Sequence, residues 1–206
     1  MHRLISISTG NWNEWCYIIF DSNLQAILID PGDDFELINA AIVTHKLHPL
    51  AILCTHAHFD HIAAVDELKN YYQTPFYLHG SDIPLLKQAN LYRHLFDGKK
   101  GISIPTVDVD LSVERTLKFG DINVRVIDTP GHTEGGVCFL IDDMLFVGDN
   151  LYNYKIGTTK LPGGNKERLM FSIKKLLSLE YSNLRLFAGH GNEMSLSEAK
   201  AQLVIN

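Results

Sequence analysis

Short runs of apolar residues, many of them β-branched or aromatic, alternate along the chain with turn-forming residues. The runs cover residues 3–8, 16–20, 26–29, 51–54, 75–78, 116–119, 123–127, 137–141, 144–147 and 184–187. Runs of this length and composition predict β-strands. Only a few polar residues separate neighbouring runs at 21–23, 120–121 and 142–143, which favours antiparallel hairpins at these places.

Apolar residues spaced three or four apart predict helices in a smaller part of the chain. One helix is expected over residues 35–42, a second over 169–177, and a third over about 60–68. Ser195 followed by Glu198 forms a capping-box pattern, which predicts the start of a last helix.

Residues 90–112 fit neither period and contain scattered glycine and proline, so they are expected to form a loop or lid. Elsewhere, strand hairpins interleaved with isolated helices indicate an α/β protein whose sheets are covered by helices. Because no linker, repeat or low-complexity tract interrupts the sequence, we expect a single domain over residues 1–206.

Composition narrows the possible functions. The 206 residues are 46% hydrophobic, and 18 basic against 24 acidic side chains give a net charge of -6, so no nucleic-acid partner is expected. The longest apolar runs are far shorter than the roughly 20 residues that cross a bilayer, and the first residues lack the apolar core of a secretory signal. The three cysteines are widely spaced, so we expect buried thiols and a cytoplasmic protein without a membrane partner.

Histidines and aspartates follow the ends of predicted strands. His56, His58, Asp60 and His61 come directly after the run 51–54. Residues two apart in an extended segment face the same way, so His56 and His58 can bind one metal ion. Asp60 and His61, at the first turn of the next helix, can then face a second ion.

Three later strands also end in a candidate metal ligand. His132, Asp149 and His190 each follow a predicted strand, and the small residues before them permit sharp turns. Loops held at the ends of a rigid sheet are where proteins usually place metal and catalytic groups. A lone histidine is usually structural, so the prediction depends on the convergence of several strand ends.

These motifs resemble the metallo-β-lactamase superfamily, whose HxHxDH signature matches residues 56–61 and whose later motifs match His132, Asp149 and His190. The resemblance implies a four-layer αββα sandwich with the metal ions at one edge of the sheets. It also implies a role for each matched residue: His56, His58 and His132 at the first ion, Asp60, His61 and His190 at the second, Asp149 as the bridge between them, and Asp30 as a support for the loops.

Two divalent metal ions are therefore expected as cofactors. A set of His and Asp ligands suits zinc and also accepts iron or manganese. Paired ions lower the pKa of a bridging water and so provide a hydroxide nucleophile at neutral pH, which makes hydrolysis the expected reaction. Asp60 and Asp149 are predicted to be catalytic as well as metal-binding.

Within the superfamily, the residues favour a thioesterase. Asp149 stands where the commonest β-lactamases have cysteine, and His58 where flavodiiron proteins have glutamate. The Pro-Gly-Gly turn at 162–164 is similar to that of short glyoxalase-II-like enzymes. This resemblance implies a hydroxyacylglutathione hydrolase-like enzyme for a glutathione-type or other small acyl thioester.

The substrate-binding positions depart from glyoxalase II. No basic extension follows His190, and Thr158 and Thr159 stand in the segment where the short relatives carry arginine and aspartate. Glutathione contacts are therefore expected to differ. We expect the small-molecule substrate to meet an aromatic side chain such as Trp12, Tyr152 or Tyr154, and its anionic group to meet a lysine, Lys155 or Lys160.

Other activities stay open at this point. A persulfide dioxygenase-like oxidoreductase would use a single iron at the three histidine positions of the first ion, with Asp149. Asp60, His61 and His190 would then be present without a metal ion. A lactonase or another ester hydrolase would use the same two-metal site. A chain that keeps its metals only for structure is disfavoured, because a degenerate member would be expected to lose ligands first.

Overall fold

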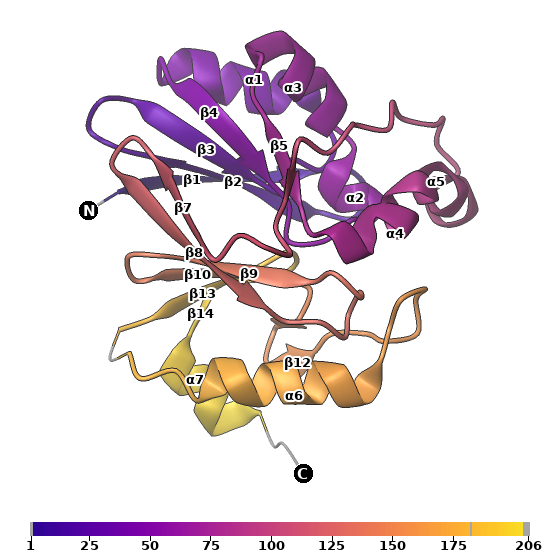
Figure 1. Ribbon diagram of the computed structural model, residues 1–206, viewed down its shortest axis with the longest axis vertical. Helices are drawn as coiled ribbons and strands as arrows, with labels where there is room; N and C mark the ends of the chain where they lie inside the picture. Colours follow the sequence, from indigo (N-terminus) through magenta and orange to yellow (C-terminus); the bar gives the residue numbers. More distant parts are fainter. Residues whose placement is uncertain (1, 182, 204–206) are drawn as a thin grey trace.

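The computed structural model describes residues 2–181 and 183–203 and contains two six-stranded sheets that face each other (Figure 1). The strands of the first sheet are adjacent in chain order: β1 (Arg3–Thr9), β2 (Glu14–Phe20), β3 (Gln25–Ile29), β4 (His48–Leu53), β5 (Phe76–Leu78) and β6 (Val109–Asp110). The pairs β1–β2 and β2–β3 are antiparallel, whereas the remaining pairs are parallel.

The second sheet comes from the C-terminal half of the chain. Its strands lie in the order β14 (Met194–Ser195), β13 (Arg185–Ala188), β10 (Met144–Gly148), β9 (Val137–Ile141), β8 (Ile122–Asp128) and β7 (Thr116–Phe119). Only the β10–β13 pair is parallel among these described strands. A separate small hairpin joins β11 (Leu151–Tyr152) to β12 (Lys155–Ile156).

Helices cover the outer face of each sheet. The first sheet carries α1 (Phe35–Thr44) and α3 (Val65–Tyr72), and the second carries α6 (Lys166–Leu177) and α7 (Leu196–Gln202) (Figure 1). The short helices α2 (Phe59–Ile62), α4 (Ile83–Lys87) and α5 (Ala89–Asp97), with the 3-10 turn η1 (Gly80–Asp82), gather at one end of the sheets. The expected αββα sandwich is therefore confirmed.

Three layers of apolar side chains hold the four layers of backbone together. Along β2, Cys16 and Ile18 pack outward against α1 and α3, whereas Tyr17 and Ile19 pack inward between the sheets. A third cluster joins the outer face of the second sheet to α6 and α7, with Ile173 fully buried. Strand residues alternate between two buried faces, which explains why the strand runs are almost wholly apolar.

The expected strand runs all coincide with strands, and the three expected hairpins are confirmed. The capping box of α7 is also present, with both of its reciprocal hydrogen bonds. The sequence analysis missed β6, β11, β12 and β14, which are each two residues long and too short to show a period. The cysteines are buried free thiols, as expected. Within the described residues, no helix combines the length and the apolarity that crossing a membrane requires.

The single helix expected over residues 60–68 is wrong, because the structure breaks it into α2 and α3. At the break, the Ala64 N–H donates to the carbonyl oxygen of Gly32 and not to the preceding turn of its own helix. A Cβ at Gly32 would lie 2.1 Å from the carbonyl oxygen of Asp60, so only glycine permits this close approach. The loop after β3 therefore sets the position of the segment that carries Asp60 and His61.

The loop expected over residues 90–112 is also wrong in part, because α5 occupies its beginning. The helix reverses the usual pattern: it buries Arg93, which donates to Asp33 at 3.0 Å, while Leu91 and Leu95 are more than half exposed. A helix with a buried arginine and exposed leucines shows no apolar stripe toward the core. The apolar pattern of α5 therefore does not reveal a helix that packs on the core, because tertiary contacts decide which of its residues are buried.

Candidate metal centre

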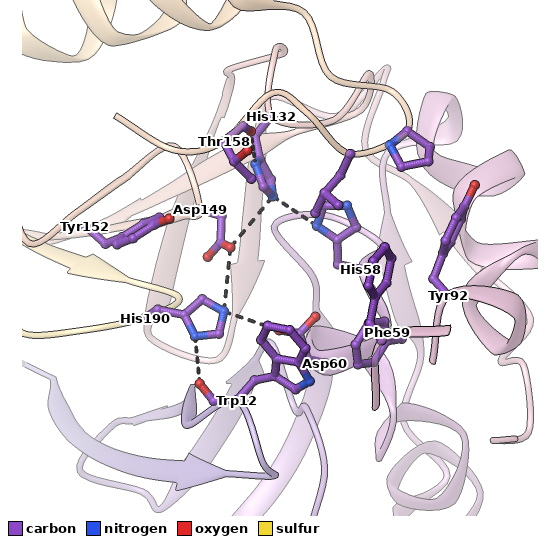
Figure 2. A pocket seen from close by; sticks show the side chains of 13 residues that line it. Trp12, His58, Phe59, Asp60, Tyr92, His132, Asp149, Tyr152, Thr158 and His190 are labelled. Carbon is purple, nitrogen blue, oxygen red and sulfur yellow. Dashed lines mark hydrogen bonds and ion pairs between the residues drawn. The ribbon is translucent and has the colours of Figure 1, made fainter. Parts of the chain in front are cut away.

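The predicted metal ligands meet at one edge of the sandwich, on the loops that follow β4, β8, β10 and β13 (Figure 2). In the first group, the ligand atoms of His56, His58 and His132 all lie within 4.8 Å of one another. The Nε2 atom of His132 is 2.9 Å from Nδ1 of His58, and all three imidazoles are buried. We call these residues the first cluster.

The second cluster consists of Asp60, His61 and His190, whose ligand atoms also lie within 4.8 Å of one another. A carboxylate oxygen of Asp60 is 3.2 Å from Nε2 of His190 and 4.0 Å from Nε2 of His61. Because the two clusters share the 55–61 segment, they lie side by side.

Asp149 lies between the two clusters. One carboxylate oxygen is 3.5 Å from Nε2 of His61, and the other is 3.7 Å from Nε2 of His132 and 3.6 Å from Nε2 of His190 (Figure 2). A single carboxylate therefore faces histidines of both clusters, which is the placement expected of a residue that bridges two ions.

Hydrogen bonds to oxygen fix the protonation of the histidines that face the cavity. Nδ1 of His132 lies 2.8 Å from the carbonyl oxygen of Thr158, and Nδ1 of His190 lies 3.1 Å from that of Trp12. A carbonyl oxygen only accepts, so in the neutral form of each imidazole Nδ1 carries the proton and Nε2 has the lone pair. Both lone pairs are thus available to a metal ion.

Asp30 similarly orients histidines of the 55–61 loop through hydrogen bonds. Its carboxylate accepts from the backbone N–H and the hydroxyl of Thr55 at 2.7 and 2.6 Å, and from Nδ1 of His61 at 3.1 Å. The Thr55 hydroxyl in turn lies 3.0 Å from Nδ1 of His56. Since its carboxylate already accepts three hydrogen bonds, Asp30 orients ligands and is not favoured as one.

The buried polar atoms left without a hydrogen-bond partner within the described chain support a metal site. They include Nε2 of His56, Nε2 of His61 and Oδ1 of Asp149. A buried polar atom normally has a partner, because leaving it unpaired costs about 1–3 kcal/mol. Nitrogen and carboxylate oxygen lone pairs that converge in this way fit a divalent cation.

The pKa shifts of two cluster histidines also agree with a metal site. Burial lowers the pKa of His58 to about 3, so its imidazole is neutral at neutral pH, which is the form that binds a metal. Burial opposes a charge on His61, but Asp149 and the other nearby carboxylates outweigh it and raise the pKa of His61 well above its ordinary value. The second cluster therefore stabilises positive charge, as a cation site must.

We expect Asp30→Asn to weaken metal binding about 10- to 100-fold, because an amide group cannot accept all three hydrogen bonds and no longer sets the protonation of His61. Asp30 has a φ of 48°, in the left-handed region that asparagine also tolerates, so the substitution adds no backbone strain. A competitive zinc titration measures the effect, with the exposed Asp121→Asn as control. Equal zinc affinity in both variants would contradict the role given to Asp30.

Asp82 is a site residue that the sequence analysis missed. It is 1% exposed, and its carboxylate accepts from the Ala57 N–H at 3.0 Å, the Thr133 hydroxyl at 2.8 Å and the Gly135 N–H at 2.6 Å. Ala57 lies between two ligands of the first cluster, and Thr133 follows the third. One carboxylate therefore joins the two loops that carry this cluster. Its partners lie 25 to 53 positions away, so no local spacing could have revealed it.

A cavity of about 370 Å³ opens over both clusters, a volume typical of small-molecule sites. The polar side is formed by cluster residues and Asp149. The opposite side is apolar and is formed by Trp12, Phe59, Tyr92, Phe96, Leu161 and Pro162. Tyr152 and Thr158 complete the lining (Figure 2).

Of the aromatic side chains expected to meet the substrate, Trp12 and Tyr152 line the cavity and Tyr154 does not. The expectation that Lys155 or Lys160 faces the substrate is not supported, because among the residues that the structure describes no lysine or arginine lines the cavity. The segment around Thr158 and Thr159, where the sequence departs from the short relatives, contributes to the site through its backbone, because the carbonyl oxygen of Thr158 orients His132.

Comparisons with known proteins agree with the metal site that the geometry indicates. The family model of the metallo-beta-lactamase superfamily matches residues 9–190. The probable metallo-hydrolase YqgX from Bacillus subtilis is 39% identical over 180 residues, which cover 84% of this chain and 82% of that protein. The hydroxyacylglutathione hydrolase GloC from Haemophilus influenzae is 30% identical over 194 residues, which cover 90% of this chain and 89% of GloC.

Two solved structures are similar over almost their whole length. The BLEG-1 B3 metallo-beta-lactamase superimposes with a TM-score of 0.92 at 32% identity, covering 98% of each chain. TTHA1623 in a di-iron-bound form has a TM-score of 0.87 at 34% identity, covering 98% of this chain and 100% of that one. With the family model matching most of the sequence and the clusters at the same edge of an αββα sandwich, the chain belongs to the metallo-beta-lactamase superfamily.

Proposed function

We propose that the protein is a metal-dependent hydrolase that cleaves small acyl thioesters. The observation that carries the proposal is the pair of three-residue clusters with Asp149 between them, at the floor of a cavity of substrate size. The similarity to GloC, which is a hydroxyacylglutathione hydrolase, supports a thioester as the bond that is cleaved.

The proposed cofactors are two divalent ions, which the two clusters would hold together with Asp149, the carboxylate between them. Bound there, the ions supply an activated water nucleophile at neutral pH and polarise the substrate carbonyl. The His and Asp donor set favours zinc. Iron is the alternative, because the similar protein TTHA1623 was solved in a di-iron-bound form.

In the proposed reaction, the water oxygen bonds to the carbonyl carbon and the carbon–sulfur bond breaks, so that the products are a carboxylic acid and a thiol. Asp60 and Asp149 line the cavity, and we assign them the hydrogen bond that orients the attacking water. The electron pair of the broken bond leaves on sulfur, and a thiolate needs little protonation. The reaction therefore requires no separate general acid.

A two-metal hydrolase and a one-iron oxidoreductase of the persulfide dioxygenase kind differ in whether the second cluster holds a metal ion, and not in whether its residues are present. Such an oxidoreductase would use only the first cluster and Asp149. Here, the second cluster also has a buried Nε2 atom without a hydrogen-bond partner in the described chain, on His61, and carboxylates that stabilise positive charge beside it. We therefore expect two metal ions per chain.

The test is a substrate panel applied to protein purified without chelator, with the metal content measured on the same sample. The panel contains S-lactoylglutathione, a neutral acyl thioester, an oxygen ester, a lactone and a β-lactam, since the similar protein BLEG-1 is a β-lactamase. We expect turnover of a thioester. If the two-metal protein cleaves only the ester, the lactone or the β-lactam, the thioesterase proposal is wrong.

We expect His58→Ala to lower kcat/KM for the thioester by more than about 100-fold, because loss of a direct ligand costs more than the 10- to 100-fold typical of an outer hydrogen-bond partner. His48→Ala is the matched control, since the exposed His48 lies at the other end of β4. Similar losses in both variants would show that the effect of His58→Ala comes from the fold and not from the metal site.

A further inference from the structure

The wall of the cavity opposite the metal clusters has the chemistry of an apolar binding site. Trp12 and Phe59 pack edge to face with ring centroids 6.1 Å apart, and Tyr92 and Phe96 stack at 6.3 Å with an angle of 19° between their planes. Trp12 is 47% exposed and Phe96 50% exposed, so their rings are only half covered by the protein. Aromatic rings left open beside a reaction site are available to a ligand.

The charged side chains near this wall also favour an apolar ligand. Arg93 and Lys99, which lie on and just after α5, are both paired with Asp33, at 3.0 and 2.8 Å. Lys99 also lies 3.6 Å from Asp97, so the two cations face two carboxylates, and within residues 2–181 and 183–203 no lysine or arginine lines the cavity. An anionic group bound against the wall would lose its hydration without gaining a partner, which is unfavourable.

We infer that one substituent of the scissile thioester is uncharged and apolar, with the size of a phenyl or branched alkyl group, and packs against Trp12, Tyr92 and Phe96. This inference rests on the proposed function. Glutathione is then not required as the thiol part of the substrate, because no lysine or arginine of the described residues lines the cavity to pair with the glutathione carboxylates. The substrate class is therefore a thioester with an apolar acyl or thiol group.

The kinetic test uses thioesters that differ in one group. With N-acetylcysteamine as the constant thiol, each CH₂ added to the acyl chain from acetyl to hexanoyl should raise kcat/KM about fourfold. The 4-methylpentanoyl and succinyl thioesters have nearly the same shape, and the charged succinyl thioester should be slower by more than about 100-fold. A second series, with a constant acetyl group and thiols of increasing apolarity, shows whether the apolar group belongs on the thiol side.

Helix α5 offers the variants and the control. Tyr92→Ala and Phe96→Ala should each lower kcat/KM for the best apolar thioester about 10-fold while changing that for the acetyl thioester less than about twofold. Leu95→Ala removes an apolar side chain from the outer face of the same helix, where it is 63% exposed and outside the cavity lining, and should change neither value.

A binding experiment separates this inference from the proposed function. The thioether S-benzyl-N-acetylcysteamine cannot be hydrolysed, and calorimetry should show that it binds the metal-loaded protein and binds about 10-fold more weakly to Phe96→Ala. Binding without turnover of any thioester would overturn the thioesterase proposal but keep the apolar site. A higher kcat/KM for S-lactoylglutathione than for S-lactoyl-N-acetylcysteamine, or rates independent of apolarity in both series, would overturn the inference.

Discussion

Asp149→Asn is expected to lower kcat/KM for thioester hydrolysis by more than about 100-fold and to reduce the number of metal ions bound per chain below two. The carboxylate of Asp149 faces Nε2 of His61, His132 and His190 at 3.5 to 3.7 Å, so it is placed to contact ions at both clusters. Asparagine has the same shape, but its amide nitrogen cannot bind a cation and its charge is zero. The substitution therefore removes a bridging anion without opening a cavity.

Asp143→Asn is the matched control for this prediction. Asp143 immediately precedes β10 and Asp149 immediately follows it, so both variants change a carboxylate at an end of the same strand. The control should keep its activity and its metal content. Two tightly bound ions and undiminished activity in Asp149→Asn would show that Asp149 does not bridge, and the proposed arrangement of the ions would be wrong.

The predicted site residues could be found from the sequence because they follow strand ends, where an apolar run gives way to turn residues. His132, Asp149 and His190 lie far apart in the chain, yet each follows a short apolar run, and the structure brings all three together. The apolar run 16–20 likewise predicted a strand, and the structure shows that this strand is buried on both faces. Local patterns predict those features that local backbone geometry produces.

The features that escaped prediction are those that tertiary contacts decide. Helix α5 buries Arg93 because Asp33, which lies 60 positions earlier, accepts its hydrogen bond. The break between α2 and α3 depends on the close approach of Gly32 to the carbonyl oxygen of Asp60. In neither case does a residue near the affected element reveal its partner, so periodicity alone gives the wrong element.

The sequence likewise did not reveal which side chains line the substrate cavity. Lys155 and Lys160 were predicted to bind an anionic group of the substrate. Both lie near Thr158 and Thr159, where the sequence departs from the short glyoxalase-II-like enzymes. The structure instead places Tyr92 and Phe96 of α5 in the cavity, in a stretch that the sequence indicated to be a loop. Substrate selection thus depends on the element that was least predictable.

Asp82→Asn is expected to lower the free energy of unfolding by about 2 kcal/mol or more, because the new amide N–H₂ would face the buried N–H of Ala57 or of Gly135 with no acceptor for it. The hydrogen bonds of Asp82 lie beside ligands of the first cluster, since Ala57 stands between His56 and His58 and Thr133 follows His132. We therefore expect zinc affinity at the first cluster to fall about 10- to 100-fold, while affinity at the second cluster changes little. Urea unfolding of the metal-free protein and a two-step zinc titration measure the two effects separately.

The titration decides whether Asp82 positions the ligands or only stabilises the fold. Thr133→Val removes one of the three hydrogen bonds that Asp82 accepts and keeps the volume of the side chain, so it should show the same selective loss at smaller size. Asp121→Asn, an exposed substitution in the turn between β7 and β8, should change neither measurement. A loss of stability with both zinc affinities intact would mean that His56, His58 and His132 keep their geometry without Asp82. The selective loss would instead show that one buried carboxylate sets the distance between the two loops that hold the first ion.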